Sequence, residues 1–362
     1  MTDVQERIQR HLDDLVGRDV ETGLQVAVYQ RGALLVDAVA GEADATLGRP
    51  LTSETPIFSF STGKNVSATL AHVLVDRGYL DYDTRVADLW PEFGTHGKAS
   101  ATLRHVLTHT VGVPAMPRGV TPSDLPDWSR VCEALAAAEP LWPPGSAMGY
   151  HSYTFGFLVG ELARRATGSP IGVLLHDWIT EPLGLEGQLW FGVPGDRLPV
   201  LAHLEQPDPP DAAPPAERSV LAPWERQPSA TLGNRAELLR ADIPSVATAT
   251  ARGLAAVFDA VLRGELVDEA SVARLAAPAY EGEDLVFGVP VRMALGFPIG
   301  RIGAPPEERS AAFGWSGGGG SYAYADPANG IAFALTKTRI TPDLDAASSV
   351  AGIVIEELDR RS

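Results

Sequence analysis

Cysteine and basic residues are both scarce in this chain of 362 residues. The single cysteine, Cys132, has no second cysteine to pair with, so an internal disulfide framework is excluded. Lysine and arginine together number 29, against 46 aspartates and glutamates, and the formal net charge is -17. Nucleic acids and anionic membrane surfaces are bound through basic patches. We therefore expect neither a nucleic acid nor a membrane as a partner.

Long apolar segments are lacking as well. No run of about 18 apolar residues, the length that spans a membrane, occurs in the chain. The N-terminal segment MTDVQERIQRHLDDLVGRDV carries charges throughout and has no apolar stretch typical of a secretory signal, so we expect a cytoplasmic protein. The composition, 45% hydrophobic and 21% charged, is that of an ordinary globular protein. The length allows about two or three structural units.

Hydrophobic periodicity predicts where the regular elements lie. Alternating apolar residues predict a hairpin near each end of the chain. The first has strands at 24–32 and 33–44, and the second has two strands around a DPANG turn within 317–340. Apolar residues at helical spacing predict helices at 4–17, 65–78, 250–264 and 344–362. The segment EQPDPPDAAPPAE, residues 205–217, is acidic and rich in proline, and we expect it to be an exposed loop.

The order of these elements predicts the domain organisation. Strands come from both ends of the chain, whereas the middle is mostly helix and loop. We therefore predict an α/β (α+β) protein in which residues 1–80 and 231–362 form a sheet domain. Residues 81–230 are expected to be an inserted, mainly helical domain, with the active site in the cleft between the two.

A first candidate nucleophile, Ser316, lies in Gly314–Gly318, which fits the pattern G-x-S-x-G of a nucleophile elbow. An elbow serine follows a strand and begins a helix, but glycines and a strand pattern follow Ser316. The corresponding triad also needs a histidine downstream, and the last histidine of the chain is His203. Ser316 is therefore not expected to be the nucleophile.

A second candidate, Ser61, is followed three residues later by Lys64, giving the pattern S-x-x-K. Positions i and i+3 share one face of a helix, so the lysine amine would lie within reach of the serine hydroxyl. A lysine there can accept or relay the proton of the serine and can support developing negative charge. The pattern is short and often occurs by chance, but here it lies at a strand-to-helix transition, which favours the functional interpretation.

A third candidate, Tyr150, stands where a Pro-Gly turn leads into a helix. A tyrosine at such a junction commonly serves only packing. It gains a chemical role if it faces Ser61 and Lys64, because the lysine would then lower the pKa of the tyrosine and make it a base.

These residues stand in segments that resemble one known family. Ser61-x-x-Lys64, Tyr150-x-Ser152 and Trp315-Ser316-Gly317 resemble the three motifs of the serine β-lactamase and penicillin-binding-protein superfamily, in the same order. Further similar segments are GYLDYDTRVADLWPEF (78–93), TLRHVLTHTVGVP (102–114) and FGWSGGGGSYAYADPANGIAFAL (313–335). The resemblance runs from about residue 8 to residue 355 and is strongest to the class C-like family VIII carboxylesterases. It implies an antiparallel sheet flanked by helices, with an inserted helical domain.

The resemblance also implies roles for individual residues. Ser61 would be the nucleophile that is acylated, Lys64 would handle its proton, and Tyr150 would act as the base. The backbone N–H groups of Ser61 and Gly318 would form the oxyanion hole. The residues that would contact the substrate are Ser152, Trp315, Ser316, Gly317 and His151.

Two departures from the family pattern bear on the substrate. Ser152 replaces the usual asparagine of the second motif, and its hydroxyl has a shorter reach. Trp315 replaces the usual lysine or histidine of the third motif, so it offers an apolar wall and one N–H donor but no positive charge. Recognition of a substrate carboxylate, as in β-lactams, is therefore in doubt, and neutral, partly apolar esters are favoured.

Three other polar residues were weighed for a role. His105 and His109 have the i, i+4 spacing of zinc ligands, but Val106 stands where a zinc protease motif needs glutamate. The resemblance makes His109 a packed, structural histidine. Neither a metal nor a cofactor is expected. Arg292 is expected on a strand near the cleft, and its contact with a substrate is left open.

We therefore predict a serine hydrolase that cleaves small carboxylic esters through an acyl-serine intermediate. The alternative is an acyltransferase of secondary metabolism that passes the acyl group to an amine or an alcohol. A β-lactamase or D-aminopeptidase is less favoured, and a catalytically silent binding protein would lack the intact S-x-x-K and tyrosine. The expected partner is a small ester or acyl substrate, while the physiological acyl group and the oligomeric state stay open.

Overall fold

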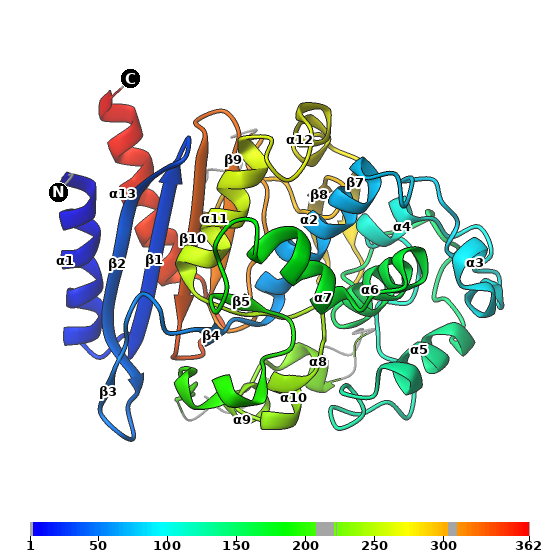
Figure 1. The fold of residues 1–362 in the computed structure, drawn as a ribbon, viewed down its shortest axis with the longest axis horizontal. Coiled ribbons are helices and arrows are strands. Elements are labelled where there is room, and N and C mark those ends of the chain that lie inside the picture. Colours follow the sequence, from blue (N-terminus) through cyan, green and yellow to red (C-terminus); the bar gives the residue numbers. More distant parts are fainter. Residues whose placement is uncertain (1–2, 208–220, 222, 303–309, 362) are drawn as a thin grey trace.

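The computed structural model describes residues 3–207, 221, 223–302 and 310–361 (Figure 1). Most of the segment 205–217, which was expected to be an exposed loop, lies outside the described residues. The four predicted long helices are all present, with ends that shift by at most two residues: α1 (Asp3–Gly17), α2 (Gly63–Asp76), α11 (Ala251–Leu262) and α13 (Asp345–Arg361).

The main sheet joins the two ends of the chain. Its strands are antiparallel and lie in the order β3-β2-β1-β10-β9. Their bounds are β1 (Gly23–Gln30), β2 (Ala33–Asp44), β3 (Arg49–Pro50), β9 (Tyr322–Asp326) and β10 (Ile331–Lys337). The predicted N-terminal hairpin is β1 and β2, the predicted C-terminal one is β9 and β10, and β1 pairs directly with β10.

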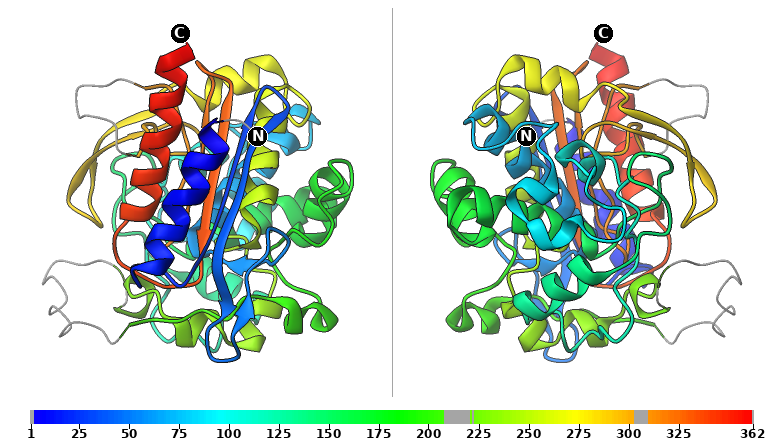
Figure 2. Two further views of the ribbon diagram at one scale, coloured as in Figure 1. Left: turned by 90° about the vertical axis from the view of Figure 1, so that its left-hand side faces the viewer. Right: turned by 90° about the vertical axis from the view of Figure 1, so that its right-hand side faces the viewer.

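The two faces of this sheet carry side chains of different size. The larger residues of β1 and β10, such as Val26 and Phe333, pack in the apolar cluster beneath α1 and α13. These two helices lie side by side over that face (Figure 2). The alternate residues, such as Ala27 and Ala334, are small and belong to the cluster on the other face, which α11 covers. The alternation follows from the two-residue period of a strand, and the alanines allow α11 to approach the sheet closely.

Further helices and small sheets make up the rest of the described chain. The remaining helices are α3 (Val86–Leu89), α4 (Leu103–Leu107), α5 (Trp128–Ala137), α6 (Thr154–Thr167), α7 (Ile171–Leu175), α8 (Pro223–Arg226), α9 (Ala230–Gly233), α10 (Ala236–Arg240) and α12 (Glu269–Leu275). A three-stranded sheet has the order β4 (Ile57–Phe58), β6 (Thr248–Ala249), β5 (Leu189–Trp190), and a hairpin is formed by β7 (Tyr280–Asp284) and β8 (Val289–Met293). In its described residues the segment 81–230 contains helices, loops and one short strand, β5, while its expected status as a separate, mainly helical domain stays a prediction.

Helix α2 runs through the interior of the molecule. Its residues from Gly63 to Leu74 are all buried, and the same apolar cluster includes residues of α6 and α11. A helix that is buried all round is held by its neighbours rather than by an amphipathic face. It therefore provides a rigid support for the residues at its N-terminus. No helix in the described part of the chain is both long and apolar enough to cross a membrane.

Candidate active site

Ser61 lies at the start of the buried helix, as its sequence position predicts. Strand β4 ends at Phe58, and a single 3-10 turn over Phe60–Thr62 leads into α2. Phe60 has φ +51°, in the left-handed region that non-glycine residues rarely occupy. Backbone strain of this kind persists only where the surroundings hold it, and it is often found at functional sites. Here the Ala247 N–H donates to the Phe60 carbonyl and the Ser59 N–H donates to the Ala247 carbonyl, so the turn is held from both sides.

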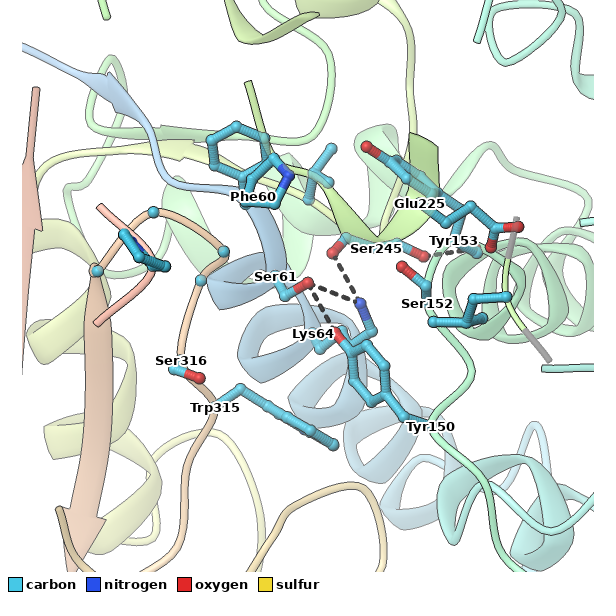
Figure 3. A pocket seen from close by; sticks show the side chains of 18 of the residues that line it. Phe60, Ser61, Lys64, Tyr150, Ser152, Tyr153, Glu225, Ser245, Trp315 and Ser316 are labelled. Carbon is cyan, nitrogen blue, oxygen red and sulfur yellow. Dashed lines mark hydrogen bonds between the residues drawn. The ribbon is translucent and has the colours of Figure 1, made fainter. Parts of the chain in front are cut away.

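The hydroxyl of Ser61 is the meeting point of two further groups (Figure 3). Lys64 Nζ lies 3.1 Å from Ser61 Oγ, and the Tyr150 hydroxyl donates a hydrogen bond to the same oxygen at 2.7 Å. Lys64 Nζ also contacts the backbone carbonyl of Ser245 at 3.4 Å. The structure thus brings together the serine, lysine and tyrosine that the sequence predicted, although Tyr150 is 89 residues away from Ser61.

Burial decides the charge of the lysine. Lys64 is only 1% exposed, and desolvation lowers its pKa well below the usual value, while the charge of Glu225 acts in the opposite direction. Burial raises the pKa of Tyr150, although its hydrogen bond with Ser61 opposes this. The expectation that Lys64 lowers the pKa of Tyr150 is therefore wrong, because the buried amine favours its neutral form. A neutral amine can accept a proton from Ser61, and Tyr150 is a phenol that can donate one.

Tyr150 is positioned by the hairpin of β7 and β8. The carboxylate of Asp284, at the end of β7, accepts a hydrogen bond from the Tyr150 backbone N–H at 3.1 Å. The same oxygen accepts from the N–H groups of Val286 and Phe287 in the hairpin turn. The ring of Phe287 lies 5.4 Å from the Tyr150 ring, measured between centroids. One buried carboxylate thus ties the hairpin turn to the segment that carries the tyrosine.

The third motif forms the opposite wall of the site. A Cβ atom added to Gly317 would lie 2.0 Å from the carbonyl oxygen of Ser59, so only glycine allows this segment to approach the turn before Ser61. Within the described residues, the backbone N–H groups of Ser61 and Gly318 donate to no acceptor of the chain. Both residues line the same cavity, so these two donors are available to a bound molecule.

Trp315 contributes a wall but not the expected donor. Its indole N–H donates to the backbone carbonyl of Gly296 at 2.7 Å and is not available to a substrate. Its ring lies 5.3 Å from the Tyr150 ring, measured between centroids. Its backbone is held by Asn65, whose side chain accepts from the Trp315 N–H at 2.7 Å and donates to the Trp315 carbonyl at 3.3 Å.

The cavity beside Ser61 has a volume of about 350 Å³. Its walls include the predicted residues Ser152, Trp315, Ser316, Gly317 and Gly318. It is also lined by residues that the sequence did not single out: Phe60, Tyr153, Leu221, Trp224, Glu225, Pro228, Ser245, Val246, Phe287, Gly319, Gly320, Pro342, Asp343 and Leu344. Asn65 and Asp284, which lie behind the walls, were missed as well. Of these two residues, only Asn65 could have been suggested by the sequence, because it directly follows Lys64 of the S-x-x-K pattern.

His151 does not line this cavity, contrary to expectation. Its ring is buried, with Nδ1 donating to the Gly149 carbonyl at 2.6 Å and Nε2 accepting from the Val113 N–H at 3.1 Å. Burial lowers the pKa of His151 to about 4, which fits a neutral ring that uses one nitrogen as donor and the other as acceptor. Both nitrogens serve the fold, so the ring supports the backbone on either side of it.

The other weighed residues also lie outside the cavity. Helix α4 ends at Leu107, before His109, whose φ is +58°, so His105 and His109 do not share a helix face as zinc ligands would. His109 is fully buried, stacks on Phe155 with 4.7 Å between ring centroids, and accepts from the His151 backbone N–H, as expected of a structural histidine. Arg292 lies on β8, where its guanidinium pairs with Glu281 at 3.1 Å.

Comparison with known proteins agrees with the fold and the motifs. The sequence matches the Beta-lactamase family over residues 8–351, and the chain belongs to this family. It is 33% identical to the Esterase/beta-lactamase LipL of Mycobacterium tuberculosis, in a match that covers 94% of this chain and 82% of the relative.

Solved structures give the same result. A family VIII carboxylesterase superposes with a TM-score of 0.86 and 28% identity, covering 96% of this chain and 98% of that one. A penicillin-binding-protein homologue from Caulobacter crescentus superposes with a TM-score of 0.85 and 33% identity, covering 96% of both chains. The chain therefore has the β-lactamase-like fold, as the motif resemblance predicted.

Proposed function

We propose that the protein is a serine hydrolase that cleaves small carboxylic esters through an acyl-Ser61 intermediate. The observation that carries the proposal is the convergence of Lys64 Nζ, at 3.1 Å, and the Tyr150 hydroxyl, at 2.7 Å, on Ser61 Oγ. A nucleophile within hydrogen-bond reach of a base and of a second proton carrier is the arrangement that covalent acyl transfer requires. The names of LipL and of the family VIII carboxylesterase support an ester as the substrate.

In the proposed reaction, neutral Lys64 accepts the proton of Ser61 while the serine oxygen attacks the ester carbonyl. The N–H groups of Ser61 and Gly318 bind the oxyanion that develops in the tetrahedral intermediate. Loss of one such donor typically costs about 2.7–4 kcal/mol in barrier height. Tyr150 donates its proton to the departing alkoxide and is reprotonated from Lys64. Water then enters and attacks the acyl carbonyl while it loses a proton to the neutral amine of Lys64, and the amine returns this proton to the Ser61 oxygen as the acid leaves.

The charges of the cavity favour an ester over a β-lactam. Lys64 is the only basic side chain among its lining residues within the described part of the chain, and burial favours the neutral form of this amine. The lining also includes two carboxylates, Glu225 and Asp343. Among these described lining residues, a substrate carboxylate would therefore find no basic side chain other than the buried amine of Lys64. Trp315 adds an apolar surface where a lysine or histidine of the family would bind such a group.

Intact-protein mass spectrometry with a short-chain nitrophenyl ester tests the assignment of the nucleophile. We expect the wild type and a Ser316→Ala variant to gain the mass of the acyl group, and a Ser61→Ala variant to gain none. The Ser316→Ala variant is the matched control, because it removes the serine of the G-x-S-x-G pattern. Acylation of the Ser61→Ala variant, or its turnover at the wild-type rate, would overturn the proposal.

Two further substrates separate hydrolysis from related reactions. A chromogenic cephalosporin should be turned over far more slowly than the nitrophenyl ester, since the described lining offers its carboxylate no basic side chain apart from the buried Lys64. An amine added during ester turnover should leave the acid as the main product. If the amide prevails instead, the protein is an acyltransferase that uses the same acyl-Ser61.

A further inference from the structure

The hairpin of β7 and β8 carries exposed apolar side chains beside the active cavity. It forms a two-stranded sheet of its own and projects from the side of the molecule (Figure 2). In its turn, Phe287 is 52% exposed although it belongs to the cavity lining, and Leu285 and Val289 are 44% and 49% exposed. Single exposed apolar residues are common on proteins, whereas a cluster of them beside a cavity is typical of a binding surface.

The strand pairing shows which way Val289 faces. Asp284 and Val289 lie directly opposite each other in the antiparallel pair, and such partners project from the same face of a hairpin. This is the inner face, because Met293 on it is fully buried and Asp284 accepts a hydrogen bond from the Tyr150 N–H. Val289 therefore faces the body of the protein and yet stays half exposed. Together with Phe287 it forms an apolar strip that leads outward from the cavity.

The charged groups of the hairpin do not compete for this strip. Glu281 and Glu283 alternate with the inner residues and so lie on the outer face, where Arg292 pairs with Glu281. The Asp284 carboxylate, on the inner face, accepts from three backbone N–H groups, those of Tyr150, Val286 and Phe287. Among the described residues of the hairpin, the strip thus offers an apolar surface, which suits an uncharged alkyl chain.

The position of Tyr150 decides which part of an ester meets the strip. In the proposed reaction, the Tyr150 hydroxyl donates its proton to the departing alkoxide, so the alcohol part of the ester has to lie beside this tyrosine. The Tyr150 and Phe287 rings are 5.4 Å apart, measured between centroids. The alcohol part is therefore the part of the substrate that lies nearest to Phe287 and, beyond it, Val289.

We propose that Phe287 and Val289 bind the alkyl chain of the alcohol, so that the protein prefers esters of long-chain, uncharged alcohols with small acids. This inference rests on the proposed esterase function and narrows it to one class of substrate. A CH₂ group that is fully removed from water favours binding roughly four-fold. A chain that two side chains cover only in part should still gain on the order of 10-fold over its length.

Two isomeric esters test this directly. Octyl butyrate and butyl octanoate have the same size and composition, but the long chain lies in the alcohol of the first and in the acid of the second. We expect kcat/KM of the wild type to be on the order of 10-fold higher for octyl butyrate, because kcat/KM includes the step that expels the alcohol. A pH-stat measures both below their solubility limits. A ratio of one, as general attraction of apolar chains would give, or a preference for butyl octanoate would refute the proposal.

A Val289→Ser variant removes part of the strip. Its ratio of the two kcat/KM values should fall by roughly 3-fold, since less of the octyl chain is covered. Val173→Ser is the matched control: Val173 lies on α7, is 45% exposed and is not part of the cavity lining. Its ratio should stay at the wild-type value. Partial unfolding lowers both rates equally and leaves the ratio unchanged, so an unchanged ratio in Val289→Ser would contradict the strip.

A neutral dye separates this proposal from the esterase function. N-phenyl-1-naphthylamine fluoresces in apolar surroundings, and 1-octanol should displace it from the wild type. The Val289→Ser variant should bind the dye more weakly than Val173→Ser. If no ester is hydrolysed but this difference is present, the esterase function fails while the strip holds. If both isomers are hydrolysed at equal rates and both variants bind the dye alike, the strip fails while the esterase function stands.

Discussion

Asn65 and Trp315, 250 residues apart, are joined by two hydrogen bonds from one amide side chain to one backbone unit. The Asn65 carbonyl oxygen accepts from the Trp315 N–H at 2.7 Å, and the Asn65 amide donates to the Trp315 carbonyl at 3.3 Å. Asn65 belongs to the first turn of α2, directly after Lys64, while Trp315 precedes Gly317 and Gly318. The pair therefore links the wall that carries Ser61 to the wall that carries the proposed second oxyanion donor.

We expect an Asn65→Ala variant to lose both stability and turnover. Each backbone group of Trp315 left unpaired in the interior costs about 1–3 kcal/mol. The segment that carries Gly318 would also shift relative to Ser61. We therefore expect kcat of ester hydrolysis to fall at least 10-fold, which corresponds to a barrier higher by about 1.4 kcal/mol or more. Urea denaturation and nitrophenyl ester turnover measure the two effects.

Asn234 provides the matched control for this variant. Its side chain makes the same pair of hydrogen bonds with the backbone of Leu204, at 2.8 and 2.9 Å, away from the cavity lining. Asn234→Ala should lose comparable stability but keep most of kcat. If both variants lose kcat equally, the Asn65 pair has no special role in aligning the site.

The buried amine of Lys64 should make the stability of the wild type depend on pH. The unfolded chain carries this lysine protonated up to about its usual pKa of 10.5, whereas the folded protein favours the neutral form down to a much lower pH. The wild type therefore gains stability as the pH rises between these two values, by about 1.4 kcal/mol per pH unit. A Lys64→Met variant has no amine to titrate at this position. Its free energy of unfolding should therefore exceed that of the wild type by more at pH 7 than at pH 9. Chemical denaturation at both values measures it, and an equal difference would show that Lys64 is charged in the folded state.

The activity of the wild type should also depend on the protonation state of Lys64. Only neutral Lys64 accepts the proton of Ser61, so kcat/KM should rise with pH through the lowered pKa of Lys64 and level off well below pH 10.5. Lys64→Arg should be inactive over the whole range, because a guanidinium group does not lose its proton in proteins. A pH profile of nitrophenyl ester turnover that rises only near pH 10.5 would contradict the assignment.

Asp284 should act on catalysis through Tyr150. Asp284→Ala removes the acceptor of the Tyr150 N–H together with two bonds of the hairpin turn, so the hydroxyl that meets Ser61 loses its support. We expect kcat to fall roughly 10-fold or more, on the scale of misplaced catalytic groups. Steady-state kinetics with the nitrophenyl ester checks this.

The hairpin of β9 and β10 supplies the control for that change. Asp326 accepts from the N–H groups of Ala328 and Asn329, the same two positions after the aspartate, but contacts no residue of the site. Asp326→Ala therefore removes the turn bonds alone and should leave kcat close to the wild type. A similar loss in both variants would assign the effect to hairpin stability.

Gly317→Ala should disrupt the site by a steric effect. The added Cβ would lie 2.0 Å from the Ser59 carbonyl oxygen, which belongs to the backbone and cannot rotate away. The wall must then move from Ser61, and turnover should fall by at least 100-fold if an oxyanion donor is lost. Gly352→Ala in α13 is the opposite case, since a Cβ there meets nothing within 4 Å. It should raise stability by up to about 1 kcal/mol through helix propensity and leave turnover unchanged.

Local patterns in the sequence were sufficient for much of the fold. The helices at α1, α2, α11 and α13 and the hairpins at both chain ends follow from apolar periodicity, because each depends on neighbours within a few residues. The S-x-x-K pattern likewise places Lys64 near Ser61, since three residues make about one helical turn. The motif resemblance then identified Tyr150 and the glycines of the third motif.

What the sequence by itself determined is therefore the local geometry and the residue types of the reacting groups. The tertiary structure decided their chemical state, because burial depends on what packs around a side chain. Packing withdraws Lys64 from water and favours its neutral form, directs the Trp315 indole to Gly296, and commits both nitrogens of His151 to the backbone. It also brings Glu225, whose sequence neighbours show no motif, into the cavity beside Ser61. Such long-range contacts have no period in the sequence, so only the folded chain reveals them.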